Sequence, residues 1–525
     1  MRITNKIMQR NNLSNINTNK IYQDQLSTQM STQKKINRPS DDPVVAIRAL
    51  RLRSNVTEVT QYYTKNIPDA ESWLKVTEES LNNLSQIITN MISRCTKGSQ
   101  GDLQTKDRQI ILEELKALGE EIYSTGDADY AGRYVFTGYR TDTSLSFPKE
   151  TELKYSITEQ LGIEAIDTLS YVDTGKLLDI NSSNFDTVAV DETQITATDV
   201  YRIRLAYKDC DANGTAPTIT YIDPTATPPE QTMTATRMSL YGTDTDAVTG
   251  ETDPYKAASD PNNKDAVIFV PETGEILLGE ESYKKLMAVK DREDTTIENE
   301  GEIKVTYEKS HWDKGNLRPQ HYFACTTTDA NGKTIDYNQE YLKGHVSHQE
   351  IEYDVGFNQT IRVNSTADEC FRPGIGREAN DLVNAMQDVL DLEATEATLK
   401  KLQEENAGDA AKSKTIQDQL DAVGKALTYA KQKEQSLFEK GITTFQKYLD
   451  DANLCITNCG TRSSKLALIK NRMQNQKTTF ETLKSENEDA DITEVAINLN
   501  SAELTYEAAL MATGKVMQTS LLNFI

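Results

Sequence analysis

The sequence contains only four histidines, and two of them, His345 and His348, lie three residues apart. Such a pair can bind a metal ion when a third ligand lies close by. The surrounding residues favour β structure and offer no third ligand nearby, so we expect no metal here. The zinc-protease motif HExxH is also absent from the sequence.

Two cysteines, Cys455 and Cys459, lie one helical turn apart, a spacing that also suits a metal ion. Both continue an apolar line with spacings of three and four residues, and a buried cysteine behaves as a small hydrophobic residue. We therefore expect both to pack in a helical core. Six cysteines in 525 residues are too few to indicate a disulfide framework.

Asp244 and Asp246 lie in a segment rich in Thr and Asp, but no glutamate follows at the spacing of a calcium-binding loop. The glycines of residues 130–139 do not follow the GxGxxG spacing, and the sequence has no P-loop or nucleophile elbow. We expect no enzyme activity, no cofactor and no metal. The tyrosines of the middle region leave open an adhesin or enzyme carried there as an alternative.

The composition also limits the possible partners. A formal charge of -24 and an aromatic content of 7% argue against affinity of the whole chain for nucleic acid. No uninterrupted apolar run exceeds five residues, so we expect no membrane span. The opening residues lack the apolar core of a cleavable signal peptide, and ordinary secretion is not predicted.

Residues 492–525 predict one long helix, roughly 50 Å at 1.5 Å per residue. Asp491 and Glu494 resemble a capping box at its start. Apolar and small residues recur at spacings of three and four along one seam, namely Ile492, Val495, Leu499, Ala502, Tyr506, Ala509, Thr513 and Val516. Near the end a second line widens it, formed by Leu510, Met517, Leu521 and Phe524. This seam needs a partner helix, from the same chain or from other copies.

The first 37 residues predict a weak helix with thinly spaced apolar residues, including Ile3 and Ile7. Residues 1–60 carry ten Lys and Arg against four Asp and Glu, a net charge of +6, whereas residues 481–525 carry a net charge of -6. Opposite charges and matching seams lead us to expect that the opening and closing helices pair. Pro39 and Pro43 break the first helix, and a new helix runs over residues 43–67.

Further helices follow from apolar residues spaced by three and four. Residues 68–122 predict an antiparallel hairpin of two helices, and residues 442–473 predict its partner in a helical rod. An exposed helical hairpin is expected over residues 393–440, and a small β element over residues 130–139.

Residues 146–370 change to short alternating segments, such as Tyr201, Ile203 and Leu205 alternating with Arg202 and Arg204. Hairpins are predicted around residues 271–274 and 331–332. The predicted fold is mainly α with an inserted β-rich domain. It divides into a terminal coiled-coil assembly domain (1–40 and 490–525), a helical rod (41–145 and 371–489) and the β-rich domain (146–370).

Four segments together carry a family resemblance: residues 35–43, 132–139, 486–492 and 520–525. They resemble the flagellin superfamily, and within it the hook-associated proteins of the hook-filament junction rather than the filament subunits. The resemblance covers about 145 residues at the N-terminus and about 155 at the C-terminus. A flagellin filament subunit is the alternative within the same superfamily.

The resemblance implies a structural protein of the bacterial flagellum, outside the cell, exported through the flagellar type III apparatus without a cleavable signal peptide. It implies terminal helices paired in a coiled coil, an antiparallel helical rod and a β domain at the distal end. It also implies a homo-oligomer whose partners are the preceding hook-associated protein, flagellin and a cytoplasmic export chaperone. No membrane or nucleic-acid partner is implied.

Overall fold

The computed structural model describes residues 5–101, 103–211, 214–223, 226–288, 303–328, 332–343 and 349–518. The chain divides into two compact units. Unit 1 comprises residues 1–71, 353–361 and 463–525, and unit 2 comprises residues 72–352 and 362–462. The prediction of a helical part together with a β-rich region is confirmed. The predicted three-domain division stays a prediction.

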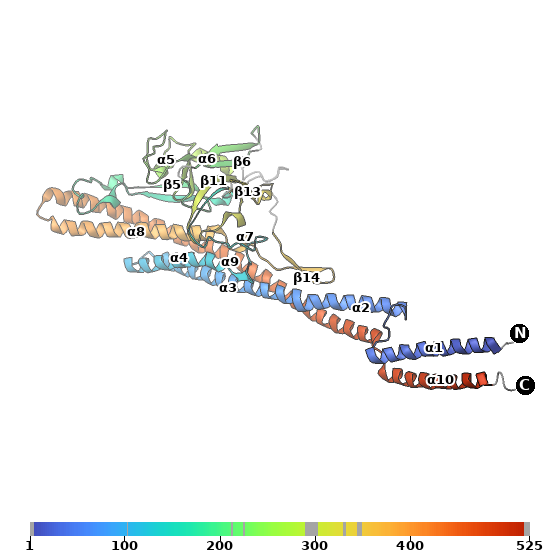
Figure 1. The fold of residues 1–525 in the computed structure, drawn as a ribbon. Helices are drawn as coiled ribbons and strands as arrows, with labels where there is room; N and C mark the ends of the chain where they lie inside the picture. The colour runs from blue at the N-terminus through green and yellow to red at the C-terminus, as the bar shows by residue number, and fades with distance from the viewer. Residues whose placement is uncertain are drawn as a thin grey trace, which may run out of the picture. The chain divides into compact units, whose positions relative to one another are not determined.

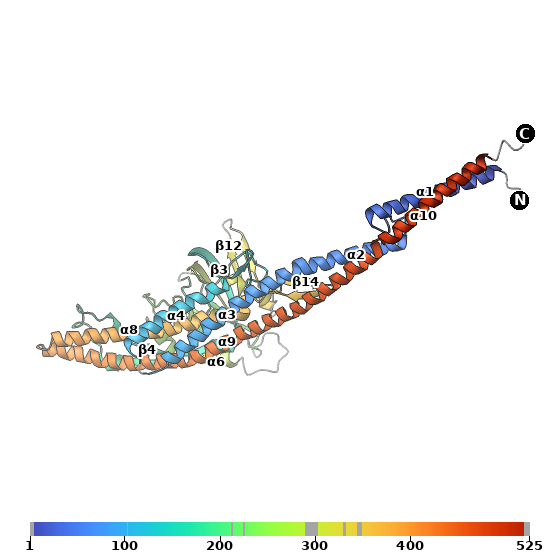
Figure 2. The same cartoon turned by 90° about the horizontal axis from the view of Figure 1, so that it is seen from below.

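Unit 1 is built mainly from helices at the two ends of the chain. They are α1 (Asn5–Thr32), α2 (Pro43–Gln61), the start of α3 (Ile67–Gly98), the end of α9 (Ala410–Glu488) and α10 (Ile492–Gln518). In Figures 1 and 2, α1 and α10 run side by side, with the N-terminal end of α1 next to the C-terminal end of α10. The two helices are therefore antiparallel.

The predicted break around Pro39 and Pro43 is confirmed, and its polar residues stabilise it. Asp41 accepts hydrogen bonds from the backbone amides of Arg38 and Asn37, at 2.8 and 3.1 Å. Asp42 caps α2 by accepting from the amides of Val44 and Val45, and Pro43 occupies the first turn, where its missing N–H has no cost.

From Pro43 to Gly98 the chain stays helical through a π-helical turn at Tyr62–Asn66. This turn stands immediately before Pro68. Its wider hydrogen-bonding pattern accommodates a proline that an uninterrupted α-helix would tolerate poorly. The helices predicted on either side of residue 68 are therefore continuous.

A hairpin from the predicted 146–370 segment packs on the helices of unit 1. It consists of β14 (Glu352–Gly356) and β15 (Gln359–Arg362), and Asn66 donates to the backbone oxygen of Asp354 at 2.8 Å. The ring of Phe357 lies edge-on between those of Tyr62 and Phe480, with centroid separations of 5.8 and 6.4 Å.

Unit 2 contains most of α3, α4 (Thr105–Gly126), α8 (Pro373–Glu405) and α9 as far as residue 462. The predicted hairpin of residues 68–122 is confirmed: Arg94 on α3 forms an ion pair of 2.8 Å with Glu114 on α4. Helix α9 lies along α3, as predicted, and Ser85 on α3 donates to Asn453 at 3.2 Å. Figure 2 shows α3 and α9 along this contact.

The predicted hairpin around residues 406–409 is present between α8 and α9, but the prediction that it is exposed is wrong. A loop segment of the β-rich region, residues 177–195, packs against it with apolar side chains such as Phe185 and Ile195. Gln419 on α9 is fully buried and donates to the backbone oxygens of Phe185 and Val188 at 2.8 and 2.6 Å. Polar and apolar contacts therefore cover this face of the hairpin.

Two sheets form the β-rich region (Figure 1). The five-stranded sheet has the order β4-β5-β10-β9-β8 and the six-stranded sheet the order β13-β12-β3-β11-β6-β7. In the first sheet the strands are β4 (Ile166–Asp173), β5 (Thr196–Arg204), β8 (Thr236–Arg237), β9 (Val267–Val270) and β10 (Glu275–Leu278). In the second they are β3 (Thr151–Leu161), β6 (Thr218–Ile222), β7 (Glu230–Thr234), β11 (Ile303–Trp312), β12 (Ala324–Thr328) and β13 (Thr334–Tyr337).

The predicted hairpins around residues 271–274 and 331–332 are confirmed by the antiparallel pairs β9-β10 and β12-β13. In the first hairpin Gly274 adopts a φ of +64°, and a Cβ there would lie only 1.9 Å from the backbone oxygen of Tyr207. This turn therefore requires glycine.

The remaining elements are short. The predicted small β element is the two-stranded pair β1 (Asp129–Tyr130) and β2 (Arg133–Tyr134). The guanidinium of Arg133 lies 5.0 Å from the ring centre of Trp73, a cation–π contact that holds this element on α3. The described residues also contain the short α-helices α5 (Pro254–Ser259), α6 (Glu280–Ala288) and α7 (Ala367–Cys370), besides short 3-10 helices.

Candidate functional site: the paired terminal helices

The contact between α1 and α10 is a narrow apolar core. Leu26 on α1 and Val495 and Ala502 on α10 are 5%, 7% and 7% exposed, and Ala490 and Leu499 pack against them partly buried. The predicted seam residues Tyr506 and Ala509 are half-buried further along α10. Ordinary burial of apolar side chains therefore holds the pair together.

Other predicted seam residues have different positions. Ile492 and Ile7 lie at the surface, 46% and 49% exposed. Ile3, Leu521 and Phe524 lie outside the described residues, and the side chain of Val516 is not described. The role of the whole seam in assembly stays a prediction.

At one end of the pair, backbone hydrogen bonds join residues 33–35 to residues 488–490, and we call this contact the clasp. Lys35 donates its amide to the oxygen of Glu488 at 2.7 Å, and Ala490 donates to the oxygen of Gln33 at 3.0 Å. Lys34 forms an ion pair of 2.5 Å with Asp489, and this contact lowers the pKa of the carboxyl group. The clasp is where the chain leaves α1 and enters α10.

Glu488 is the buried charge of this clasp, since its side chain is 2% exposed. Arg53 on α2 binds both of its oxygens, at 2.6 and 2.8 Å, and Lys34 lies 3.8 Å away. Its hydrogen bond to Glu488 raises the pKa of Arg53. The opposite charges of the two chain ends therefore meet at specific residues, and a bidentate pair of this kind also fixes orientation.

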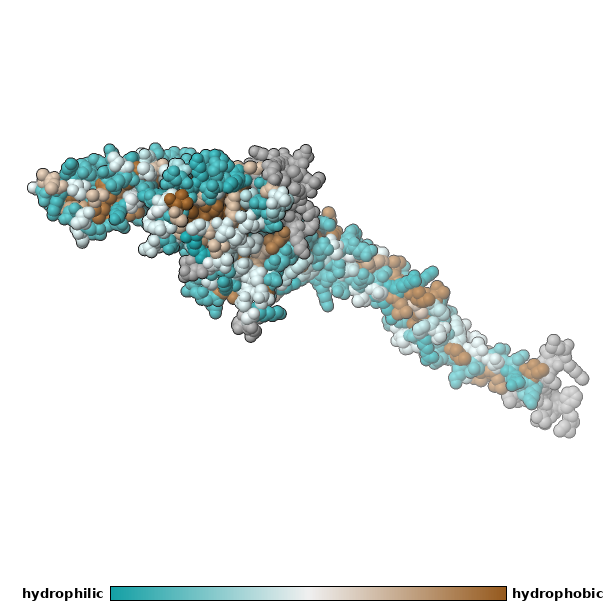
Figure 3. All heavy atoms as spheres, turned by 90° about the horizontal axis from the view of Figure 1, so that it is seen from above, coloured by the Kyte–Doolittle hydropathy of each residue, from teal (hydrophilic) through white to brown (hydrophobic). Residues whose placement is uncertain are grey.

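The outer face of α10 carries a second apolar line. Ile497, Leu504 and Met511 follow at intervals of seven residues and are 63%, 68% and 67% exposed. Sequence reasoning missed them, although their spacing is that of a heptad repeat. In Figure 3, brown hydrophobic side chains lie among hydrophilic ones on the part of unit 1 that leads to the grey chain ends.

Exposed apolar residues also follow the other terminal helices. Leu13 and Ile21 on α1 are 62% and 60% exposed, and Val44, Ile47 and Leu50 on α2 are 60%, 54% and 63% exposed. Exposed apolar residues gathered in this way are typical of surfaces that contact other protein molecules.

The residues considered for chemistry have structural roles or lie outside the described part. His345 and His348 belong to residues that are not described. Cys455 and Cys459 are buried, and the prediction that they pack in a helical core is confirmed. Among the described residues, no group of three or more His, Cys, Asp or Glu is arranged to hold a metal ion.

Of the two aspartates in the polar loop, Asp246 also has a structural role. Asp246 is buried and accepts from the amides of Val248 and Thr249 at 3.0 and 2.8 Å, whereas Asp244 is exposed. These contacts close a turn within the loop, and the backbone amides occupy one oxygen of the carboxylate.

An open groove in unit 2 lies between α4, α8 and residues 146–148 and 314–316. Tyr123 lines it, and its hydroxyl donates to the oxygen of Pro373 at 3.1 Å while accepting from the amide of Gly376 at 2.9 Å. Burial raises the pKa of this phenol, so it is not poised to transfer a proton at neutral pH. In this groove Tyr123 therefore serves to pack α4 against the start of α8.

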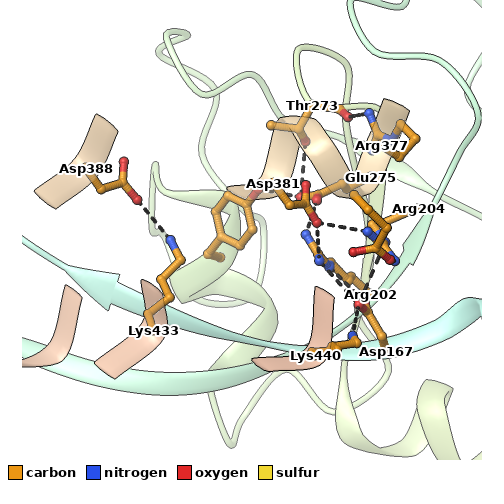
Figure 4. A network of polar contacts seen from close by, with 12 residues as sticks. Asp167, Arg202, Arg204, Thr273, Glu275, Arg377, Asp381, Asp388, Lys433 and Lys440 are labelled. Atoms are coloured by element: carbon orange, nitrogen blue, oxygen red, sulfur yellow. Dashed lines mark hydrogen bonds and ion pairs between the residues drawn. The ribbon is translucent and has the colours of Figure 1, made fainter. Parts of the chain in front are cut away.

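A buried charge network joins the five-stranded sheet to α8 and α9 (Figure 4). Arg202 on β5 is 3% exposed and contacts three carboxylates: Asp167 at 2.8 Å, Glu275 at 2.5 Å and Asp381 at 2.7 Å. Arg204 contacts Asp381 at 3.0 Å. The alternation along β5 did not reveal that Arg202 is buried, because the acidic residues that surround it are distant in sequence.

Lys440 on α9 completes the network through an ion pair of 2.8 Å with Asp167. Burial alone would raise the pKa of Asp167, but the neighbouring Arg202 and Arg204 bring it below its usual value. The same two arginines hold the pKa of Asp381 low against burial. Asp167 and Asp381 are thus ionised at neutral pH, and the network attaches the sheet to the helices.

None of the helices in the described ranges has the length and apolar character needed to cross a membrane.

Residues 3–141 match the family model of the bacterial flagellin N-terminal helical region. The matched range spans α1 to α4 and ends beyond β2. It includes the segments 35–43 and 132–139 that carry the resemblance. The C-terminal segments 486–492 and 520–525 lie outside it, so the likeness there stays a prediction.

Curated relatives match over a similar length. The chain is 28% identical over 145 residues to flagellar hook-associated protein 3 of Salmonella typhimurium, and equally to that of Escherichia coli. These matches cover 27% of this chain and 45% of each relative, so the chain spans less than half the length of the curated relatives it matches. It is 27% identical over 122 residues to a flagellin of Clostridium tyrobutyricum, covering 23% of this chain and 32% of that protein.

Two solved structures also align with the chain. A putative flagellar hook-associated protein from Vibrio parahaemolyticus aligns over 86% of this chain and 100% of its own, at 13% identity and a TM-score of 0.32. Flagellar hook-associated protein 3 of Legionella pneumophila aligns over 83% and 98%, at 9% identity and a TM-score of 0.29. These scores are too low to support an argument from shape. On sequence, residues 3–141 match the flagellin N-terminal helical region, and this part of the chain is similar to flagellar hook-associated protein 3.

Proposed function

We propose that this protein is a structural component of the bacterial flagellum that joins the hook to the filament. The observation that carries the proposal is the similarity of its N-terminal region to flagellar hook-associated protein 3, which is longer than the match to flagellin. The described residues hold no cluster of potential metal ligands. The function is mechanical, and it is exerted by surfaces rather than by a catalytic site.

In this proposal α1 and α10 form a coiled coil that packs against other copies of the chain. The antiparallel contact around Leu26 and Val495 supports pairing within one chain. The outward line of Ile497, Leu504 and Met511 supplies a surface for neighbouring subunits. The helical rod then carries the β-rich region at the distal end of each subunit.

The proposed partners follow from a position between hook and filament. One end of the homo-oligomer binds the preceding hook-associated protein, and the other binds flagellin. The subunit reaches the outside of the cell through the flagellar type III apparatus, without a cleavable signal peptide. Before export, a cytoplasmic chaperone covers the apolar surface of residues 492–525, because such a surface promotes aggregation.

A flagellin that builds the filament itself is the second candidate, supported by the match to a clostridial flagellin. An adhesin or enzyme carried by the β-rich region is a third, and no contact in the described residues favours it. Abundance separates the first two, since a junction protein is a minor component of the appendage and a flagellin its bulk.

Deletion of residues 492–525 tests the structural role. We expect the truncated protein to leave cells without attached filaments, while unit 2 keeps its fold as measured by the fluorescence of Trp73 and Trp312. Attached filaments on cells that produce only the truncated protein would contradict the proposal.

A further inference from the structure

Unit 1 carries an open groove between α2 and the end of α9, with a volume of about 470 Å³. Its lining combines charged and apolar side chains: Arg48, Arg51, Leu52, Leu483, Glu486 and Asn487. Leu483 is 43% exposed there. The groove thus offers apolar surface next to basic side chains.

The groove has a positive charge that the chain itself does not neutralise. Arg48 and Arg51 are exposed, and neither forms an ion pair with a described residue. Glu486 is the one acidic residue of the lining. Lys35 lies beside it, because its side chain donates to the backbone oxygen of Glu486 at 2.6 Å. The groove and its edge therefore carry three cations against one carboxylate.

Exposed apolar residues continue this surface along α2. Val44 and Ile47 precede Arg48 and Arg51 by four residues each, so the four side chains lie on one face of the helix. Val44 and Ile47 are 60% and 54% exposed. The surface that surrounds the groove is therefore both apolar and basic.

The outer line of α10 has the complementary composition. Glu494 precedes Ile497 by three residues and Glu507 follows Leu504 by three, so both glutamates lie on the same side as the exposed line that ends at Met511. We call these five residues the ridge. Both glutamates are exposed, and neither forms an ion pair with a described residue. Over its whole length α10 carries three glutamates against one lysine.

We propose that the ridge of one subunit docks in the groove of a second copy of the chain. Its glutamates lie at Arg48 and Arg51, and its apolar residues pack on Leu52 and Leu483. The inference rests on the proposed assembly function and specifies which two surfaces meet. Within one chain α10 pairs with α1 through its opposite face, around Val495, and this leaves the ridge exposed.

Charge favours this contact over the two symmetric ones. Two grooves brought together would oppose arginines, and two ridges would oppose glutamates, whereas a groove and a ridge bring opposite charges together. A contact between two different surfaces is heterologous, and its repetition builds a ring or a helical array of subunits. The proposed contact therefore suits a protein that assembles from many copies.

Two charge-reversal variants of the full-length protein test the contact. The groove variant carries Arg48→Glu and Arg51→Glu, and the ridge variant carries Glu494→Arg and Glu507→Arg. Sedimentation equilibrium of the purified proteins measures self-association. We expect wild type to self-associate and each variant alone to associate about tenfold more weakly, because its groove and its ridge then have charges of the same sign.

An equimolar mixture of the two variants should restore association. The acidic ridge of the groove variant fits the basic groove of the ridge variant, and the reversed surfaces fit each other as well. Restoration would also show that both variants are folded. Wild-type protein that stays monomeric at every concentration, variants that associate like wild type, or a mixture as weak as its components would each overturn the proposal.

Matched controls separate the contact from general effects of charge and exposure. Lys400→Glu with Lys401→Glu, at exposed positions of α8, changes the net charge as much as the groove variant and should leave association unchanged. Leu504→Asp should weaken association, whereas Leu468→Asp, at a similarly exposed leucine of α9 outside the groove, should not. Equal effects of a test variant and its control would contradict the proposed surfaces.

Association of the purified protein is measured without flagella, so its result does not depend on where the protein lies in the appendage. Charge-dependent association by a protein that labels the whole filament would sustain the contact and refute the junction role. A protein found at the junction whose variants associate like wild type would sustain the junction role and refute the contact.

Discussion

Arg202 is the residue on which the attachment of the five-stranded sheet depends. Its guanidinium contacts Asp167, Glu275 and Asp381, and all four side chains are largely buried. Removing one member of a buried ion network leaves the others without compensation, which costs far more than losing an exposed pair.

We expect Arg202→Met to lower the free energy of unfolding of unit 2 by about 3–5 kcal/mol, because buried Glu275 loses its ion-pair partner while Asp167 and Asp381 keep only Lys440 and Arg204. Urea unfolding followed by the fluorescence of Trp73 and Trp312 measures it. Lys284→Met is the matched control, since Lys284 on α6 forms exposed ion pairs with Glu280 and Glu281 and should show no change. Equal stability of the two variants would contradict this role for Arg202.

Glu159 is a second buried charge, 2% exposed, on β3. Its carboxylate accepts from the hydroxyl of Tyr307 and from the amide of Ala206, the latter at 2.8 Å. Burial raises its pKa from 4.5 to about 7, against the effect of these hydrogen bonds. The folded state therefore holds this proton more tightly than the unfolded state.

This linkage predicts a pH dependence. The stabilising effect of the proton on Glu159 is full below pH 4.5 and is lost as the pH rises through about 7. Glu159→Gln cannot ionise, so its stability relative to wild type should rise by about 3 kcal/mol between pH 4.5 and pH 8. Urea unfolding at the two pH values measures the change, and Glu280→Gln is the exposed control. An unchanged difference between Glu159→Gln and wild type would refute the linkage.

At this scale the sequence predicted local contacts well and distant ones poorly. Asp42 and Pro43 were readable as a helix start because a cap acts within one turn. The ion pairs of Arg202 were not predictable, because its partners Glu275 and Asp381 are distant from it in sequence. Glu275 is the first residue of the otherwise apolar strand β10. A carboxylate at such a position was the one sign in the sequence that a cation is buried beside it.

At the scale of elements, α10 has two apolar faces with different partners. Val495 is buried against α1, whereas Ile497, two residues later, is 63% exposed. The first residue contributes to pairing within the chain. In the proposed assembly the second contacts another subunit.

Two matched substitutions separate these faces. Val495→Asp places a charge in the contact of α1 and α10, so we expect both helices to lose amide hydrogen-exchange protection in the isolated protein. Ile497→Asp should leave that protection intact and instead reduce incorporation into flagella. Loss of protection in both variants, or in neither, would show that the faces are not distinct.

The elements themselves were largely predictable. Strong spacings of three and four identified α3, α9 and α10, and alternation identified β5. The packing of residues 177–195 on the α8–α9 hairpin was not predictable, because apolar residues follow no regular period in that segment. Gln419 inside an otherwise helical pattern indicated that a polar partner was needed, but not which segment supplies it.

At the scale of the whole molecule, the proposed assembly surface lies at the chain ends, and the β-rich region contains a buried charge network. Unit 1 exposes apolar lines on α1, α2 and α10, whereas the Arg202 network in unit 2 is buried. The pairing of the chain ends was predictable from their opposite charges and apolar seams, and their role in assembly stays a prediction. The order of strands in the two sheets was not predictable, since it depends on pairings between distant segments.

The central claim is the position of the protein in the flagellum, and immunogold labelling of detached flagella tests it most directly. Antibodies against the full-length protein, depleted of any that bind purified flagellin, are used for electron microscopy. The account predicts gold particles at a single site on each flagellum, where the filament meets the hook. Particles distributed along the whole filament would contradict it and identify the protein as a filament subunit.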